Sequence, residues 1–164
     1  MTTKAAPLHK SPRTWFRFGL TAGAALSMGW PAGAQVVIDG DTIKLDGITY
    51  ELHGIDAPEA RHICVDGWPA GREAEEYLGK LIDGKKITCI RLSRNRDGDS
   101  VAICKADGVD LGAAMVTGGY AFAFVPYSAR YISQEDAAVS ARRGVHAHHC
   151  LSPWKWRARL RNGQ

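Results

Sequence analysis

The chain has 164 residues, enough for one domain with a hydrophobic core. Its net charge of +4 comes from its two ends, because residues 1–34 and 151–164 each carry four basic residues and no acid. Residues 35–150 hold 13 basic and 17 acidic residues, a net charge of −4, which excludes the broad basic surface typical of general nucleic-acid binding.

The first 34 residues have the pattern of an export signal. Four basic residues precede the apolar run "FGLTAGAALSMGW", which is too short to span a bilayer. Ala32-Gly33-Ala34 then offers a small-residue cleavage site. We therefore predict a signal peptide over residues 1–34 and a mature chain that begins at Gln35. This chain would have no stable membrane span and would be secreted or periplasmic; an uncleaved anchor or an amphipathic arm is the alternative.

Strand and helix patterns follow in order after residue 35. Three strand-like runs cover residues 36–38, 42–45 and 48–55, and Asp46-Gly47 between the last two is a hairpin signal. The apolar periodicity of "GWPAGREAEEYLGKLIDG" predicts a helix that begins near residue 69 or 70 and ends at Gly84.

The second half of the chain predicts two more strands and two more helices. "KITCIRL" and "SVAICKA" are strands on either side of the polar turn "SRNRDGD". Asp110 can cap a short helix that ends at Gly118-Gly119, and "YAFAFVPY" is a further extended run. A Ser-x-x-Asp capping signal at Ser133 begins a third helix, which ends at Gly144. Five strands with helices between and after them predict an α+β fold, a small closed barrel with helical cover.

Four cysteines, at positions 64, 89, 104 and 150, predict two disulfides in an oxidising compartment. Cys89 and Cys104 lie on two strand-like runs joined by a turn, which favours this pair. Cys64 and Cys150 would then close a long loop. The alternative is a zinc site around "VHAHHC", but that stretch lacks the CxxC or HxxxH spacing of structural zinc.

The motifs "VIDGDTIKL", "GIDAPEA", "AGREAEEYL", "VDLGAAMVTGGYAFAF" and "EDAAVSARRGV" occur in the order seen in thermonuclease-like (staphylococcal or micrococcal nuclease-like) domains. The chain resembles this family over about residues 36–145. The resemblance implies a five-stranded OB-type β-barrel with three helices and a calcium-dependent phosphodiesterase ancestry that cleaves DNA and RNA. Residues 35–150 would form this domain, and residues 151–164 a basic C-terminal tail.

The resemblance also implies a metal site. The family holds its metal with two aspartates and a backbone carbonyl, at positions that match Asp41, Asp56 and the carbonyl of Ala57. Such oxygen donors suit a hard cation such as Ca²⁺, which polarises a phosphoryl oxygen. The family's candidate general base matches Glu59, which would take a proton from water. Solvated acids at strand ends are the alternative interpretation.

Two arginines of the family pattern are replaced by acids in this chain. The matching positions hold Glu51 and Asp99, which we expect to be non-functional. Loss of one well-aimed donor reduces catalysis by roughly 10²–10³-fold in other enzymes. A pocket that joins these two acids to Asp41, Asp56 and Glu59 should hold a divalent cation and disfavour nucleic acid.

Two functions therefore remain open from the sequence. The first is a domain whose nuclease activity is weak or lost and which binds a cation or another ligand. The second is an active Ca-dependent endonuclease that hydrolyses DNA and RNA, with phosphate bound by Arg61, Arg94 or Arg96 and with Tyr127 near the nucleotide. We expect a monomer in either case.

Overall fold

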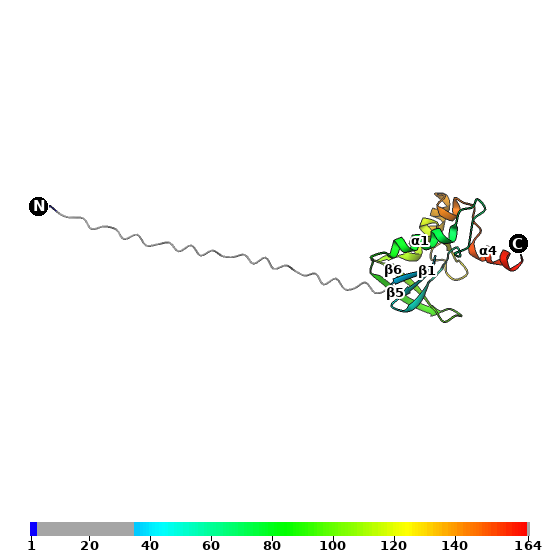
Figure 1. Ribbon diagram of the computed structural model, residues 1–164, viewed down its shortest axis with the longest axis horizontal. Coiled ribbons are helices and arrows are strands. Elements are labelled where there is room, and N and C mark those ends of the chain that lie inside the picture. The colour runs from blue at the N-terminus through cyan, green and yellow to red at the C-terminus, as the bar shows by residue number, and fades with distance from the viewer. Residues whose placement is uncertain (3–34, 164) are drawn as a thin grey trace. The chain divides into compact units, whose positions relative to one another are not determined.

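The computed structural model describes residues 1–2 and 35–163 (Figure 1). The signal peptide predicted for residues 1–34 lies outside the described residues, apart from its first two. Among the described helices, none combines the length and apolar character needed to cross a membrane.

A mixed sheet forms the centre of the fold. Its hydrogen-bonded order is β1-β2-β3-β6-β5, in which β3 and β6 are parallel and the other neighbours are antiparallel. These strands are β1 (Gln35–Asp39), β2 (Thr42–Leu45), β3 (Ile48–Leu52), β5 (Ile87–Arg94) and β6 (Ser100–Ala106). Two short pieces extend the pairing: β7 (Val109–Asp110) pairs with β6, and β4 (Ile55–Asp56) pairs with β8 (Phe122–Ala123). The predicted α+β class is confirmed and the order is consistent with an OB-type fold, but within residues 35–163 no ladder joins β1 to β5, so the barrel is not closed.

The helices exceed the three that were predicted. They are α1 (Ala70–Ile82), α2 (Leu111–Gly118), α3 (Ile132–Ser140) and α4 (Pro153–Arg161), with a 3₁₀ turn η1 (Gly144–His146). The fourth helix forms in the segment that we predicted to be a basic tail, and it lies near the C-terminal end in Figure 1. Proline at its first position suits a helix start, because that backbone nitrogen needs no partner there.

Local capping and turn signals were accurate in two places and wrong in one. Asp46 and Gly47 both have positive φ, as the predicted hairpin turn requires, and the Asp110 carboxylate accepts a hydrogen bond from the Ala113 N–H at 3.1 Å. The predicted cap at Ser133 is wrong: α3 begins at Ile132 without a side-chain cap. This helix also ends at Ser140 rather than Gly144, because the chain turns into positive φ at Arg142.

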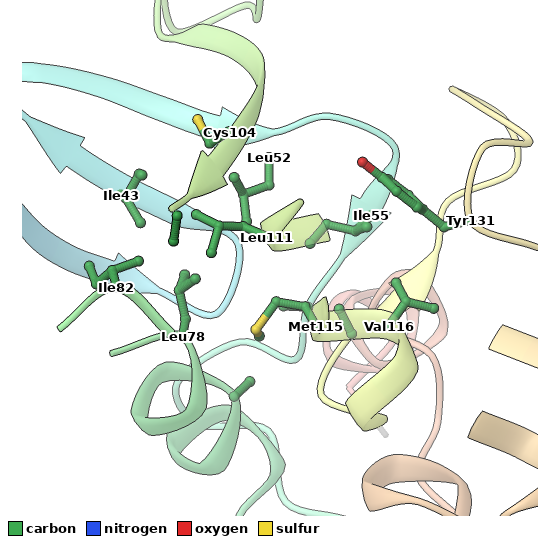
Figure 2. Close-up of a cluster of buried hydrophobic side chains, with 14 of the residues drawn as sticks. Ile43, Leu52, Ile55, Leu78, Ile82, Cys104, Leu111, Met115, Val116 and Tyr131 are labelled. Carbon is green, nitrogen blue, oxygen red and sulfur yellow. The ribbon is translucent and has the colours of Figure 1, made fainter. Parts of the chain in front are cut away.

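The hydrophobic core lies between the sheet and helices α1 and α2. Figure 2 shows Leu78 and Ile82 of α1 directed toward Ile43 of β2, with Met115 of α2 beside them. These side chains are at most 4% exposed, and each is expected to contribute roughly 1.5–3 kcal/mol through burial. This packing fixes the ends of the strands, where the predicted acidic residues lie.

Helix α1 also packs directly against the backbone that carries Glu59. A Cβ atom added to Gly71 would overlap the Glu59 carbonyl oxygen, whereas one added to Gly79, in the same helix, would meet nothing within 4 Å. We therefore expect Gly79→Ala to raise the free energy of unfolding by about 0.5–1 kcal/mol, because alanine is the better helix former. Gly71→Ala should instead lower it by about 1–3 kcal/mol through overpacking. Urea unfolding of both variants measures this, and equal stabilisation would contradict the close contact.

Candidate active site

A hollow of about 460 Å³ lies where the ends of several strands meet. Its walls carry six carboxylates: Asp39, Asp41, Glu51, Asp56, Glu59 and Asp97. The only Lys or Arg among its described lining residues is Arg157 of α4. The three predicted acids of the metal and base positions therefore share one hollow with the backbone of Ala57.

Asp41 lies in the turn between β1 and β2 and faces the start of the Ala57–Glu59 segment. Its Oδ2 atom accepts a hydrogen bond from the Ala57 N–H at 2.7 Å, and its own N–H donates to Asp39 Oδ1 at 3.1 Å. Desolvation raises the pKa of Asp41 well above its usual range, and the nearby charge of Asp39 adds to this effect. The ionised form of the Asp41 carboxyl group is therefore disfavoured in the structure.

Asp56, at the end of β4, is only 8% exposed and forms an ion pair with Arg157. Arg157 donates from Nη1 to Asp56 Oδ1 at 3.1 Å and from Nη2 to Asp56 Oδ2 at 2.7 Å, a fork that engages both oxygens. Arg157 Nη1 also donates to Glu59 Oε1 at 2.6 Å. Burial raises the pKa of Asp56 and Arg157 opposes this, while the hydrogen bond to Asp56 raises the pKa of the guanidinium.

Glu51 and Asp99, the acids at the two arginine positions, occupy different places. Glu51 lines the acidic hollow, and its Oε2 atom accepts a hydrogen bond from Asn95 Nδ2 at 2.9 Å. Asp99 lines a second hollow, with Arg91 and Arg94, and Asp97 lines the acidic one in its place. The turn explains this, because Asn95 Oδ1 accepts hydrogen bonds from the N–H groups of both Asp97 and Asp99 and folds the chain around itself. The acidic hollow therefore differs from the five-carboxylate pocket expected from the sequence.

The three arginines proposed as substitutes do not line the acidic hollow. Arg61 and Arg96 are exposed, and Arg94 donates to the Gly98 carbonyl at 2.6 Å within its own turn. Tyr127 does line the hollow, with its ring 5.4 Å from that of Phe124. The basic side chain that reaches the acids comes instead from α4.

Sequence reasoning missed Arg157, although one of its own predictions pointed to it. Both predicted disulfides are present, Cys89–Cys104 and Cys64–Cys150. Cys64 lies five residues after Glu59, so the second bond brings the start of the C-terminal segment to the loop that follows the acids. Arg157, seven residues after Cys150, is then within reach of Asp56. The disulfide prediction therefore places the basic tail near the acids, but it does not indicate which of its four basic residues reaches them.

The zinc alternative has no support in this geometry, because Cys150 is in a disulfide and His148 Nδ1 lies 2.7 Å from Asp66 Oδ2. Within residues 1–2 and 35–163, no three His, Cys, Asp or Glu side chains are grouped to hold an ion by themselves. The site predicted from the sequence needs only two carboxylates and a carbonyl. Its donors are all oxygens with excess negative charge, and they fit a hard cation that keeps several waters.

The strand order, the first three helices and the acids at the strand ends define a thermonuclease-like domain. The sequence model described as "Staphylococcal nuclease homologue" matches residues 49–147, more than half of the chain, so the chain belongs to this family.

Two relatives with this family name, and one named for succinoglycan biosynthesis, are similar to most of the chain. The probable staphylococcal-like nuclease CAN1 of Oryza sativa subsp. japonica is 32% identical over 127 residues, which cover 76% of this chain and 37% of that protein. Staphylococcal-like nuclease CAN1 of Arabidopsis thaliana is 30% identical over 115 residues, covering 68% and 34% respectively. Succinoglycan biosynthesis protein ExoI of Rhizobium meliloti (strain 1021) is 34% identical over 111 residues, covering 60% and 58%. The chain thus spans about a third to three fifths of these relatives' lengths.

Proposed function

We propose that this chain is an exported staphylococcal nuclease-like domain that binds a divalent cation, Ca²⁺ in particular, and hydrolyses phosphodiesters weakly or not at all. The observation that carries the proposal is the composition of the hollow: six carboxylates and one arginine. Export is supported by the two disulfides, since such bonds persist in oxidising compartments.

The charge of the hollow favours a cation. Asp41 has backbone N–H and hydroxyl groups near its carboxylate, and Arg157 reaches only Asp56 and Glu59. Besides burial, the charges of Asp39 and Asp56 raise the pKa of Asp41, and the charges of Glu59 and Asp39 raise the pKa of Asp56. A hard cation with oxygen ligands would relieve this repulsion, with Asp41, Asp56 and the carbonyl of Ala57 as its protein ligands.

The same charge disfavours a phosphodiester. A substrate phosphate brings negative charge into a hollow where Glu51 and Asp97 face it from the sheet and the turn. The one guanidinium present is already committed to three hydrogen bonds with Asp56 and Glu59. Glu59, the candidate general base, accepts one of these bonds through Oε1, so one of its two oxygens is already engaged.

A second candidate function has one specific observation in its favour. Arg157 lines the hollow, so it is placed to bind a phosphate oxygen if a cation takes over Asp56. The chain would then be an active Ca-dependent endonuclease that uses Arg157 rather than Arg61, Arg94 or Arg96. The bound cation would polarise a phosphoryl oxygen, and Glu59 would accept the proton of the attacking water.

Calorimetric titration with Ca²⁺ tests the first function through Asp41→Asn. This change keeps an oxygen for the Ala57 N–H but removes one charge, and we expect it to weaken Ca²⁺ binding by about 100-fold, the upper range seen when groups around metal sites are lost. Asp46→Asn, in the exposed hairpin turn, is the matched control and should leave Ca²⁺ affinity unchanged. Absence of Ca²⁺ binding by the unmodified chain would contradict the proposal.

A DNA hydrolysis assay separates the two functions. Rapid Ca²⁺-dependent turnover that disappears in Glu59→Gln would establish the endonuclease and overturn the first function. Binding of Ca²⁺ without turnover would leave the first function standing.

A further inference from the structure

We propose that Arg157 is an internal competitor for the cation at Asp56. Helix α4, anchored by the Cys64–Cys150 disulfide, holds the guanidinium on Asp56 and Glu59, and a divalent cation must displace it. The inference rests on the proposed function, because it concerns the regulation of that same site.

The contact between Arg157 and Asp56 engages both oxygens of the carboxylate. Oδ1 and Oδ2 of Asp56 are 3.1 Å and 2.7 Å from the two Nη atoms, and Glu59 Oε1 accepts a third bond. A cation at Asp56 needs one of the same oxygens at 2.3–2.6 Å, the usual Ca²⁺–oxygen distance. A cation at this distance from Asp56 would also lie close to the positively charged guanidinium and repel it, so we expect binding of the cation and of the guanidinium to oppose each other.

The rest of α4 is fixed in a way that aims Arg157 at the acids. Trp156 stacks on the ring of His62, a buried residue three positions after Glu59, with the two ring centroids 4.9 Å apart. Trp154 packs edge-on against Phe122 at 5.9 Å and belongs to a second apolar cluster that also contains the disulfide. The covalent bond and the two tryptophans thus hold the part of the chain that leads directly into Arg157.

The competitor can nevertheless leave. The Arg157 side chain is 37% exposed, so water reaches it and its ion pair is weaker than a fully buried one. Rotation of this long side chain would release Asp56 without unfolding α4. Arg157 therefore raises the cation concentration that is needed to fill the site, but it does not prevent binding.

Calcium titration of Arg157→Ala tests the competition. We expect this variant to bind Ca²⁺ about 10-fold more tightly than the unmodified chain, a coupling in the usual range between two ligands of one site. Arg159→Ala removes the same charge from an exposed position of α4 and should change the affinity little. Arg157→Lys keeps the positive charge but loses the two-pronged guanidinium, so its Ca²⁺ affinity should lie between that of the unmodified chain and that of Arg157→Ala.

The outcomes separate the inference from the function on which it rests. Equal Ca²⁺ affinity in Arg157→Ala and the unmodified chain would overturn the competition and leave the cation site intact. Absence of binding in every variant would overturn the cation site itself. Binding by Arg157→Ala alone would support the competition and overturn the proposed function, because the unmodified chain would then not bind Ca²⁺.

A direct readout follows Arg157 itself. In nitrogen-15 NMR spectra, the side-chain N–H signal of Arg157 should shift as Ca²⁺ is added, in proportion to site occupancy. A signal that stays unchanged at saturating Ca²⁺ would overturn displacement.

The role of the disulfide is tested by joint Cys64→Ser and Cys150→Ser substitution, which should raise Ca²⁺ affinity, whereas joint Cys89→Ser and Cys104→Ser substitution should not. If the first pair does not fold, Arg157→Ala and the NMR titration still decide the proposal.

Discussion

Replacing Glu51 with arginine should raise the rate of Ca²⁺-dependent DNA hydrolysis by about 10²–10³-fold, the size of effect of one aimed donor on a reacting oxyanion. Glu51 lies on β3 and lines the acidic hollow together with Asp41. The N–H of Leu52, the residue after Glu51, donates a hydrogen bond to the Asp41 carbonyl at 2.8 Å. The change removes a negative charge and adds a positive one where a phosphate would lie. The measurement is the initial rate on a DNA substrate at fixed Ca²⁺.

Asp99→Arg is the matched control for this prediction. The two positions correspond to the two arginines of the family pattern, but Asp99 lines a separate hollow beside Arg91 and Arg94. An arginine there should add little to the rate. A gain from Asp99→Arg alone would show that the turn over residues 95–99 rearranges around the substrate. No gain from a folded Glu51→Arg variant would show that the acidic hollow does not bind the phosphate.

Features of the fold that depend on short stretches were predictable from the sequence. The hairpin at Asp46-Gly47, the Asp110 cap and the extent of β6 follow from residues within one element, whereas α1 ends two residues before the predicted Gly84 and β5 runs two residues into the predicted turn. The start of α3 was not predictable in this way. Tyr131 is 2% exposed and its hydroxyl donates to Asp110 Oδ1 at 2.9 Å, so a contact across 21 residues fixes where the helix begins and overrides the Ser133 signal.

The candidate site also combines features that short sequence stretches predict with features that depend on long-range contacts. Asp41, Asp56 and Glu59 stand in short motifs, and their common hollow followed from the resemblance. Which acid of the 95–99 turn faces that hollow depends on hydrogen bonds from the turn's backbone to Asn95, a local Asx-type turn that the sequence prediction did not include. Arg157 lies 98 and 101 residues from its two partners, so only tertiary packing brings it to them.

Loss of the Cys64–Cys150 disulfide should lower the free energy of unfolding more than loss of Cys89–Cys104. The two bonds close segments with sequence separations of 86 and 15 residues. Loop-closure entropy of the unfolded chain then gives about 4.6 kcal/mol for the longer loop and about 3 kcal/mol for the shorter. Paired Cys→Ser variants in urea unfolding measure both values.

Which disulfide costs more unfolding free energy when it is removed shows how strongly α4 depends on Cys64–Cys150. Cys89 and Cys104 face each other within the β5–β6 ladder, whose hydrogen bonds persist when the bond is removed. Cys64–Cys150 instead joins the loop after Glu59 to the start of α4, where the other links are the side-chain contacts of the two tryptophans and the Arg157 ion pair. A larger loss from the Cys89–Cys104 pair would mean that α4 is held mainly by those contacts. Arg157 would then remain on Asp56 whether or not the disulfide is formed.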